Sequence, residues 1–63
     1  MLSTKLADQN RLIRGISLEE IKETIEKGIK TNQKNIILSS YNDIVVFYTK
    51  KSNNLIVTNV ASK

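Results

Sequence analysis

The side chains best suited to chemistry in this chain are basic. The sequence has ten Lys and Arg against six Asp and Glu, a formal net charge of +4, and it has no His and no Cys. Lys and Arg neutralise phosphate groups, and the ring of a Tyr can stack on a base. Five residues therefore form the candidate set for contact with nucleic acid or another phosphate: Arg11, Arg14, Tyr48, Lys50 and Lys51.

The placement of these charges supports the grouping. Arg11 and Arg14 are three residues apart on a predicted helix and so share a face, and Lys50 and Lys51 fall at the tip of a predicted hairpin. Residues 18–27 hold four Glu and two Lys, a net charge of −2, so the rest of the chain carries a net charge of +6. The alternative interpretation is that these are solvated charges that keep a small domain soluble.

The sequence offers no convincing catalytic group. Without His it lacks the commonest general base and metal ligand, and without Cys it lacks a thiol nucleophile and a thiolate zinc site. Its only glycines, Gly15 and Gly28, are predicted helix stops and form no phosphate-binding loop. The acidic residues cluster on one predicted helix instead of converging from several segments. We therefore predict no catalytic residue, no metal and no cofactor.

Two helices are expected to open the chain. The first is capped by Ser3 or Thr4 and ends at Gly15, where a left-handed backbone is available at little steric cost. Its apolar stripe is formed by Leu2, Leu6 and Ile13, with Ala7 and Leu12 at its edges. The second, residues 18–27, begins with the capping box Ser17-Leu18-Glu19-Glu20 and carries the apolar stripe Leu18, Ile21 and Ile25. Gly28 closes it.

Three strands follow, at residues 35–40, 44–49 and 55–60, with residues 30–34 interpreted as a polar connection. Short polar turns between strands favour antiparallel neighbours. The fold expected for residues 1–63 is one small α+β domain in which two N-terminal helices pack on a three-stranded antiparallel sheet, an ααβββ meander.

The central strand is apolar on both faces. One face carries Ile44, Val46 and Tyr48, and the other carries Val45, Phe47 and Thr49. Phe47 is interpreted as a core residue, and the second face is expected to be wrapped by the helices or covered by another subunit. The last strand is expected at the edge of the sheet, where it could pair with a partner strand. The predicted protein interface is accordingly Leu55, Val57 and Val60.

The stretch Arg14-Gly15-Ile16-Ser17-Leu18-Glu19-Glu20-Ile21 resembles the junction between two helices in a family of small uncharacterised bacterial domains allied to the RelE/ParE and BrnT toxins. A Gly after the second helix and the late segment Leu55-Ile56-Val57-Thr58 are also similar. The resemblance implies two helices followed by a curled antiparallel sheet. Members usually carry a His in the first helix, which this chain lacks, so the resemblance implies a fold more than a nuclease activity.

Three functions remain open. The first is a non-catalytic module that binds a macromolecule, a regulator or inhibitor of the kind encoded by phages or mobile elements. The second is a RelE-like ribonuclease toxin or its degenerate relative, because basic residues and a Tyr can serve phosphodiester cleavage without His. The third is a homodimeric subunit that docks through its sheet. With no signal peptide and no membrane-length apolar run, a cytoplasmic location away from membranes is expected.

Overall fold

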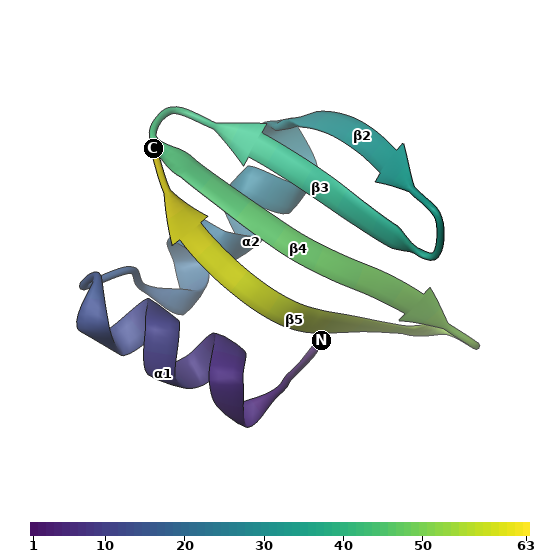
Figure 1. Cartoon of the computed structure of the whole chain (residues 1–63), viewed down its shortest axis with the longest axis horizontal. Helices are drawn as coiled ribbons and strands as arrows, with labels where there is room; N and C mark the ends of the chain where they lie inside the picture. The colour runs from purple at the N-terminus through teal and green to yellow at the C-terminus, as the bar shows by residue number, and fades with distance from the viewer.

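The sheet of this protein has five strands, two more than expected. The computed structural model describes residues 1–63 and shows an α+β fold with strand order β1-β5-β4-β3-β2 (Figure 1). The four strands β2 to β5 pair antiparallel with one another, and β1 pairs parallel with β5. The elements are β1 (Leu2–Ser3), α1 (Lys5–Ile13), α2 (Leu18–Lys27), β2 (Ile29–Gln33), β3 (Ile36–Tyr41), β4 (Ile44–Lys51) and β5 (Asn54–Ser62).

The expected three-stranded antiparallel sheet is therefore wrong, because two segments without a strand-like pattern pair at its edges. The residues interpreted as a polar connection form β2, whose five side chains are all exposed. Pairing with β3 across the turn Lys34–Asn35 holds this strand. At the other edge β1, expected as part of the first helix, pairs with Ile56 and Val57. Backbone hydrogen bonding rather than side-chain burial forms both strands, so neither segment shows the apolar alternation in the sequence that would predict a strand.

The ends of the helices follow the expected capping chemistry. Thr4 caps α1 by accepting a hydrogen bond from the backbone N–H of Ala7, and Gly15 after the helix is left-handed, with φ of 67°. The capping box of α2 is complete. Ser17 Oγ accepts from the backbone N–H of Glu20 at 3.1 Å, and the Glu20 carboxylate accepts from the N–H of Ser17 at 3.0 Å.

Both helices contribute to a single small core on one face of the sheet. Helix α2 packs on β3 and β4, and α1 packs on β5 (Figure 1). The core consists of Ala7, Ile16, Ile21, Ile25, Val46, Tyr48, Val57 and Val60. The stripe predicted for α2 is confirmed at Ile21 and Ile25, which are buried, while Leu18 remains 48% exposed.

The stripe predicted for the first helix is wrong. Leu6 and Ile13 face solvent, and of the apolar residues of α1 only Ala7 is buried. Helix α1 is instead held to β5 through polar groups. The Asn10 side-chain amide donates to Asn59 Oδ1 at 2.6 Å. Hydrogen bonding and a small Ala thus bring α1 close to the sheet, and its larger apolar side chains point outward.

Candidate functional site

The residues predicted to contact phosphate do not converge on one site. Arg11 folds back on its own loop, where its guanidinium Nη1 donates to the carbonyl of Ile16 at 3.2 Å and its Nε lies 3.9 Å from Asp8 Oδ1. Only 18% of its side chain is exposed. Arg11 therefore stabilises the α1–α2 corner, and little of its charge is presented to a ligand.

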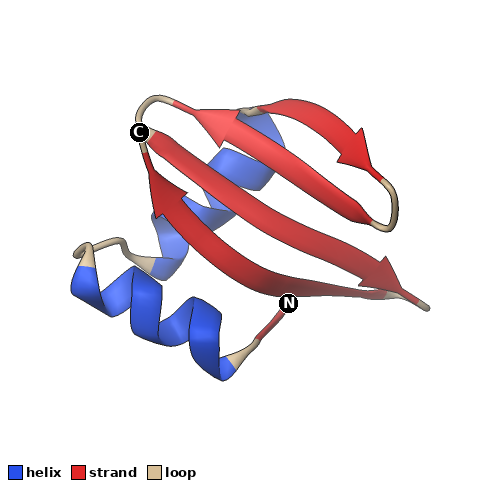
Figure 2. Ribbon diagram, viewed as in Figure 1, coloured by secondary structure: helices blue, strands red, loops and turns tan.

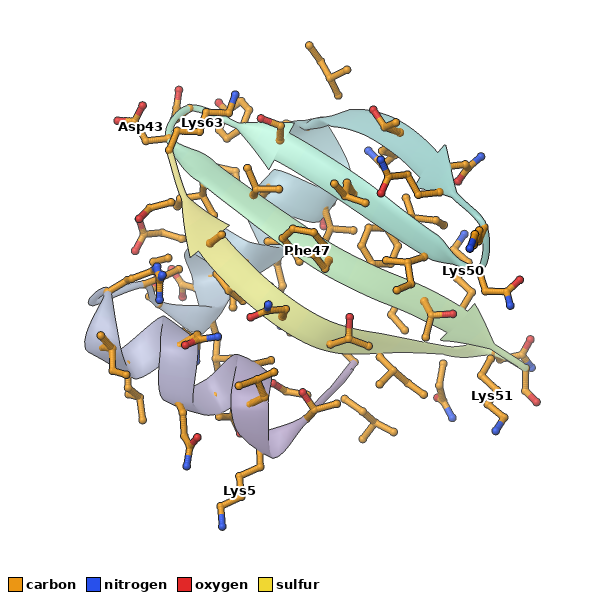
Figure 3. All side chains as sticks on the ribbon, viewed as in Figure 1. Lys5, Asp43, Phe47, Lys50, Lys51 and Lys63 are labelled. Atoms are coloured by element: carbon orange, nitrogen blue, oxygen red, sulfur yellow. The ribbon has the colours of Figure 1, made fainter.

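Of the remaining basic residues of the set, Arg14 lies at the same corner, as the C-cap of α1, and only the two hairpin lysines lie far from it. Arg14 lines a shallow depression together with Glu20 and Asp43. Lys50 and Lys51 lie at the β4–β5 hairpin, at the opposite end of the sheet from Asp43 and Lys63 (Figure 3). The structure thus brings Arg14 next to acidic groups and leaves the two hairpin lysines by themselves.

Tyr48 belongs to the core. Its side chain is 2% exposed on the helix face of β4, so it cannot stack on a base in this conformation. Phe47, interpreted from the sequence as the core residue, is only partly buried and lies on the other face (Figure 3). The alternation along β4 was predicted correctly, but the face that the helices cover is the one that carries Tyr48.

Burial of Tyr48 predicts a dependence of stability on pH. Desolvation in the core raises the pKa of the Tyr48 phenol above its usual value. Because the folded-state pKa is the higher one, the contribution of Tyr48 is complete below about pH 10 and is lost as the pH rises through the folded-state pKa. We expect urea unfolding of wild type to show a fall in the free energy of unfolding in this alkaline range.

The matched variant is Tyr48→Phe, which keeps the ring and removes the titrating hydroxyl. It should match wild type in stability near neutral pH and lose less stability in the alkaline range. An equal fall in the free energy of unfolding of the two proteins at alkaline pH would contradict the burial of the Tyr48 hydroxyl.

The predicted protein interface lies inside the protein. Val57 and Val60 are 0% and 1% exposed, and Leu55 packs against the core. Strand β5 is not an edge strand, because β1 pairs with its outer side and β4 with its inner side. These three side chains hold the helices on the sheet, and no partner could reach Val57 or Val60 without unfolding the protein.

One uncovered apolar surface is the side of the sheet that faces away from the helices. Figure 2 shows this side toward the viewer, with no helix in front of it. Its positions follow from the strand register, which pairs Leu38 with Phe47, Thr49 with Ile56, and Leu2 with Ile56. We call this surface the open face and define it by its apolar residues Leu2, Ile29, Ile36, Leu38, Val45, Phe47, Ile56 and Ala61.

The open face is shaped as well as apolar. Ile36, Leu38 and Phe47 line a shallow depression that is bounded by the β2–β3 turn at Gln33, Lys34 and Asn35. The strand register places no charged side chain on the open face between the ends of the strands, where its polar members are uncharged residues such as Thr31, Gln33 and Thr49. This arrangement can bury apolar side chains of another molecule, and it offers no group for acid–base chemistry.

Sequence reasoning identified only part of this surface. The sequence predicts that Val45, Phe47 and Thr49 share one apolar face of the central strand, but the interpretation of Phe47 as a core residue was wrong, so the sequence did not identify this face as the uncovered one. Leu38 and Ile36 were assigned to a strand, but their faces were not. The signal that could have placed them is the short turn at Asn42–Asp43, because it fixes the register that sets Leu38 opposite Phe47.

No group of three His, Cys, Asp or Glu is positioned to hold a metal ion. Neither helix has the length and apolarity needed to cross a membrane. Comparison with protein-family models, with curated proteins and with solved structures gives no match to this chain. The resemblance to the RelE/ParE and BrnT group therefore stays a prediction.

Proposed function

We propose that this chain is a non-catalytic binding module, a regulator or inhibitor, that acts by contact with another protein through its open face. The observation that supports this is an apolar sheet face that no element of the chain covers. Exposed apolar side chains that cluster on one face of a small protein mark sites of association. Because the chain has no Cys and so carries none of the disulfides typical of oxidising compartments, we place this association in the cytoplasm.

Nucleic-acid binding and cleavage have weaker support from the geometry. A ribonuclease of the RelE type needs basic groups and a Tyr gathered around one phosphate. Here Tyr48 is buried, Arg11 is engaged with the Ile16 carbonyl, and the hairpin lysines lie elsewhere. No observation favours a shared phosphate site. Specific cleavage of RNA is therefore a result that would contradict the proposal in the experiment below.

Site-specific photo-crosslinking tests the proposal. A photoreactive phenylalanine analogue is placed at residue 47 on the open face and, as the control, at residue 13, whose side chain is 78% exposed on α1. Irradiation of expressing cells should give protein adducts from position 47 and few from position 13. The proposal fails if neither position gives a protein adduct, or if purified wild type cleaves RNA specifically and Arg14→Ala abolishes the cleavage.

A further inference from the structure

We infer that the occupant of the open face is a second copy of this chain, packed face to face with the two β4 strands antiparallel. This inference rests on the proposed function and names its partner. Three features of the open face carry it: its lack of charge, its size, and the placement of charges at its two ends.

The lack of charge favours a copy of the same surface. The chain carries a net charge of +4, but its charged residues lie on the helices, in turns and at strand ends. In Figure 3 the labelled Lys5, Asp43, Lys50, Lys51 and Lys63 surround the sheet, with Phe47 near its centre. An apolar centre inside a polar rim is the usual anatomy of a protein interface. A nucleic acid or a highly charged protein would find no complementary charge at this centre.

The size of the open face meets the minimum for a specific dimer. Five strands with 30 residues in all lie side by side in the sheet, and at about 3.3 Å per residue and about 4.8 Å between strands they span roughly 500 Å². Two such faces would bury about 1,000 Å² in total, the lower limit for a specific interface. We therefore expect a dimer that dissociates in the micromolar range, and one that forms without any rearrangement of the chain.

The charges at the ends of β4 select the orientation. Lys51 lies four residues after Phe47 and Asp43 lies four residues before it. A twofold axis through Phe47 that runs the strands antiparallel brings Asp43 of each copy over Lys51 of the other. A parallel arrangement would instead stack the Lys50–Lys51 tips of the two copies. Antiparallel packing thus brings a carboxylate of each copy toward the basic tip of the other and keeps the two basic tips apart.

Sedimentation equilibrium over a range of protein concentrations tests the inference. We expect wild type to shift from monomer to dimer, and Phe47→Asp to weaken the dimer at least a hundredfold. The matched control is Ile13→Asp, which puts the same charge on an exposed apolar site of α1 and should dimerise like wild type. Circular dichroism melts check that each variant is folded. If Phe47→Asp proves unfolded, Ile36→Asp, at a side chain 41% exposed on the open face, serves in its place.

The orientation is tested by exchanging charges at the two ends. Asp43→Lys and Lys51→Asp should each weaken the dimer several-fold at low salt, because each places like charges together twice. The double variant should recover wild-type affinity. Lys63 lies beside Asp43 and is present in all four proteins, so its effect is common to this comparison.

Three results would overturn the inference: a wild type that stays monomeric at millimolar concentration, a dimer that a folded open-face variant leaves intact, or a double variant no tighter than the single ones. If wild type is monomeric but residue 47 crosslinks to a different protein, the second copy is excluded while the proposed function stands. If no protein reaches residue 47 at all, both fail.

Discussion

Gly28→Ala is expected to leave most of the protein unfolded at room temperature. Gly28 lies where the end of α2 meets β3, and a methyl group built on it would overlap Ser39 Oγ and the Thr24 carbonyl and come within 2.9 Å of the Ser40 carbonyl. Two of these three atoms belong to the backbone and cannot move aside. Gly28 has an ordinary φ of −73°, so the requirement for glycine here is one of space.

The overlap would also break a buried hydrogen bond. Ser39 Oγ donates to the Thr24 carbonyl at 2.5 Å, and both residues are fully buried. Overpacking costs about 1–3 kcal/mol and a broken buried hydrogen bond about 1–3 kcal/mol more. A chain of this length has a margin of only about 3–5 kcal/mol. Circular dichroism and urea titration of the variant should therefore show little folded protein.

Gly15→Ala is the control for this substitution. Gly15 has φ of 67° but no atom within 4 Å of an added Cβ, so Ala there costs only about 1–2 kcal/mol of backbone strain. The two variants thus separate lack of space from backbone conformation. A Gly28→Ala protein as stable as Gly15→Ala would contradict the close approach of α2 to β3.

Ile21→Ala is expected to have the second largest effect on stability. Ile21 is 1% exposed in the centre of the core, and removing a buried Ile side chain costs about 2–5 kcal/mol. For a domain of this size each kcal/mol lowers the melting temperature by about 4–8 °C. We expect a fall of about 8 °C or more, measured by thermal circular dichroism.

Ile13→Ala provides the matched comparison, with the same substitution on the other helix. Ile13 is 78% exposed, so its truncation should change the free energy of unfolding by no more than about 0.5 kcal/mol. A large loss at Ile13 would mean that the outward stripe of α1 is buried after all. It would restore the helix orientation that the spacing of Leu6 and Ile13 predicted.

The elements that sequence reasoning predicted correctly are those specified by local chemistry. The capping box at Ser17 and Glu20 is present as predicted, and the polar turns at Asn42–Asp43 and Ser52–Asn53 separate three strands. Strand β2 could not be predicted, because its five side chains are all exposed and only pairing with β3 makes it a strand. Strand β1 is two residues long, and it is a strand only because it pairs with β5.

The candidate site was predicted in part. Alternation along β4 predicts two apolar faces, but it does not tell which one the helices cover, because that choice depends on contacts between distant parts of the chain. As a result, Tyr48 lies in the core, where Phe47 was expected, and Phe47 lies on the uncovered face. The burial of Val57 and Val60 has the same origin, since β5 is the strand on which α1 packs. The central strand was expected to have two apolar faces, the second of them wrapped by the helices or covered by another subunit. The proposed function follows from the second of these alternatives.

The central claim is that the open face is the surface through which the chain acts, and that a second copy fills it. Methyl NMR spectra recorded over a dilution series test this claim most directly. We predict concentration-dependent shifts for Ile36, Leu38 and Val45, which lie on the open face, and unchanged signals for Val46 and Val60 on the helix face. Spectra that do not change with concentration, or shifts confined to the helices, would contradict it.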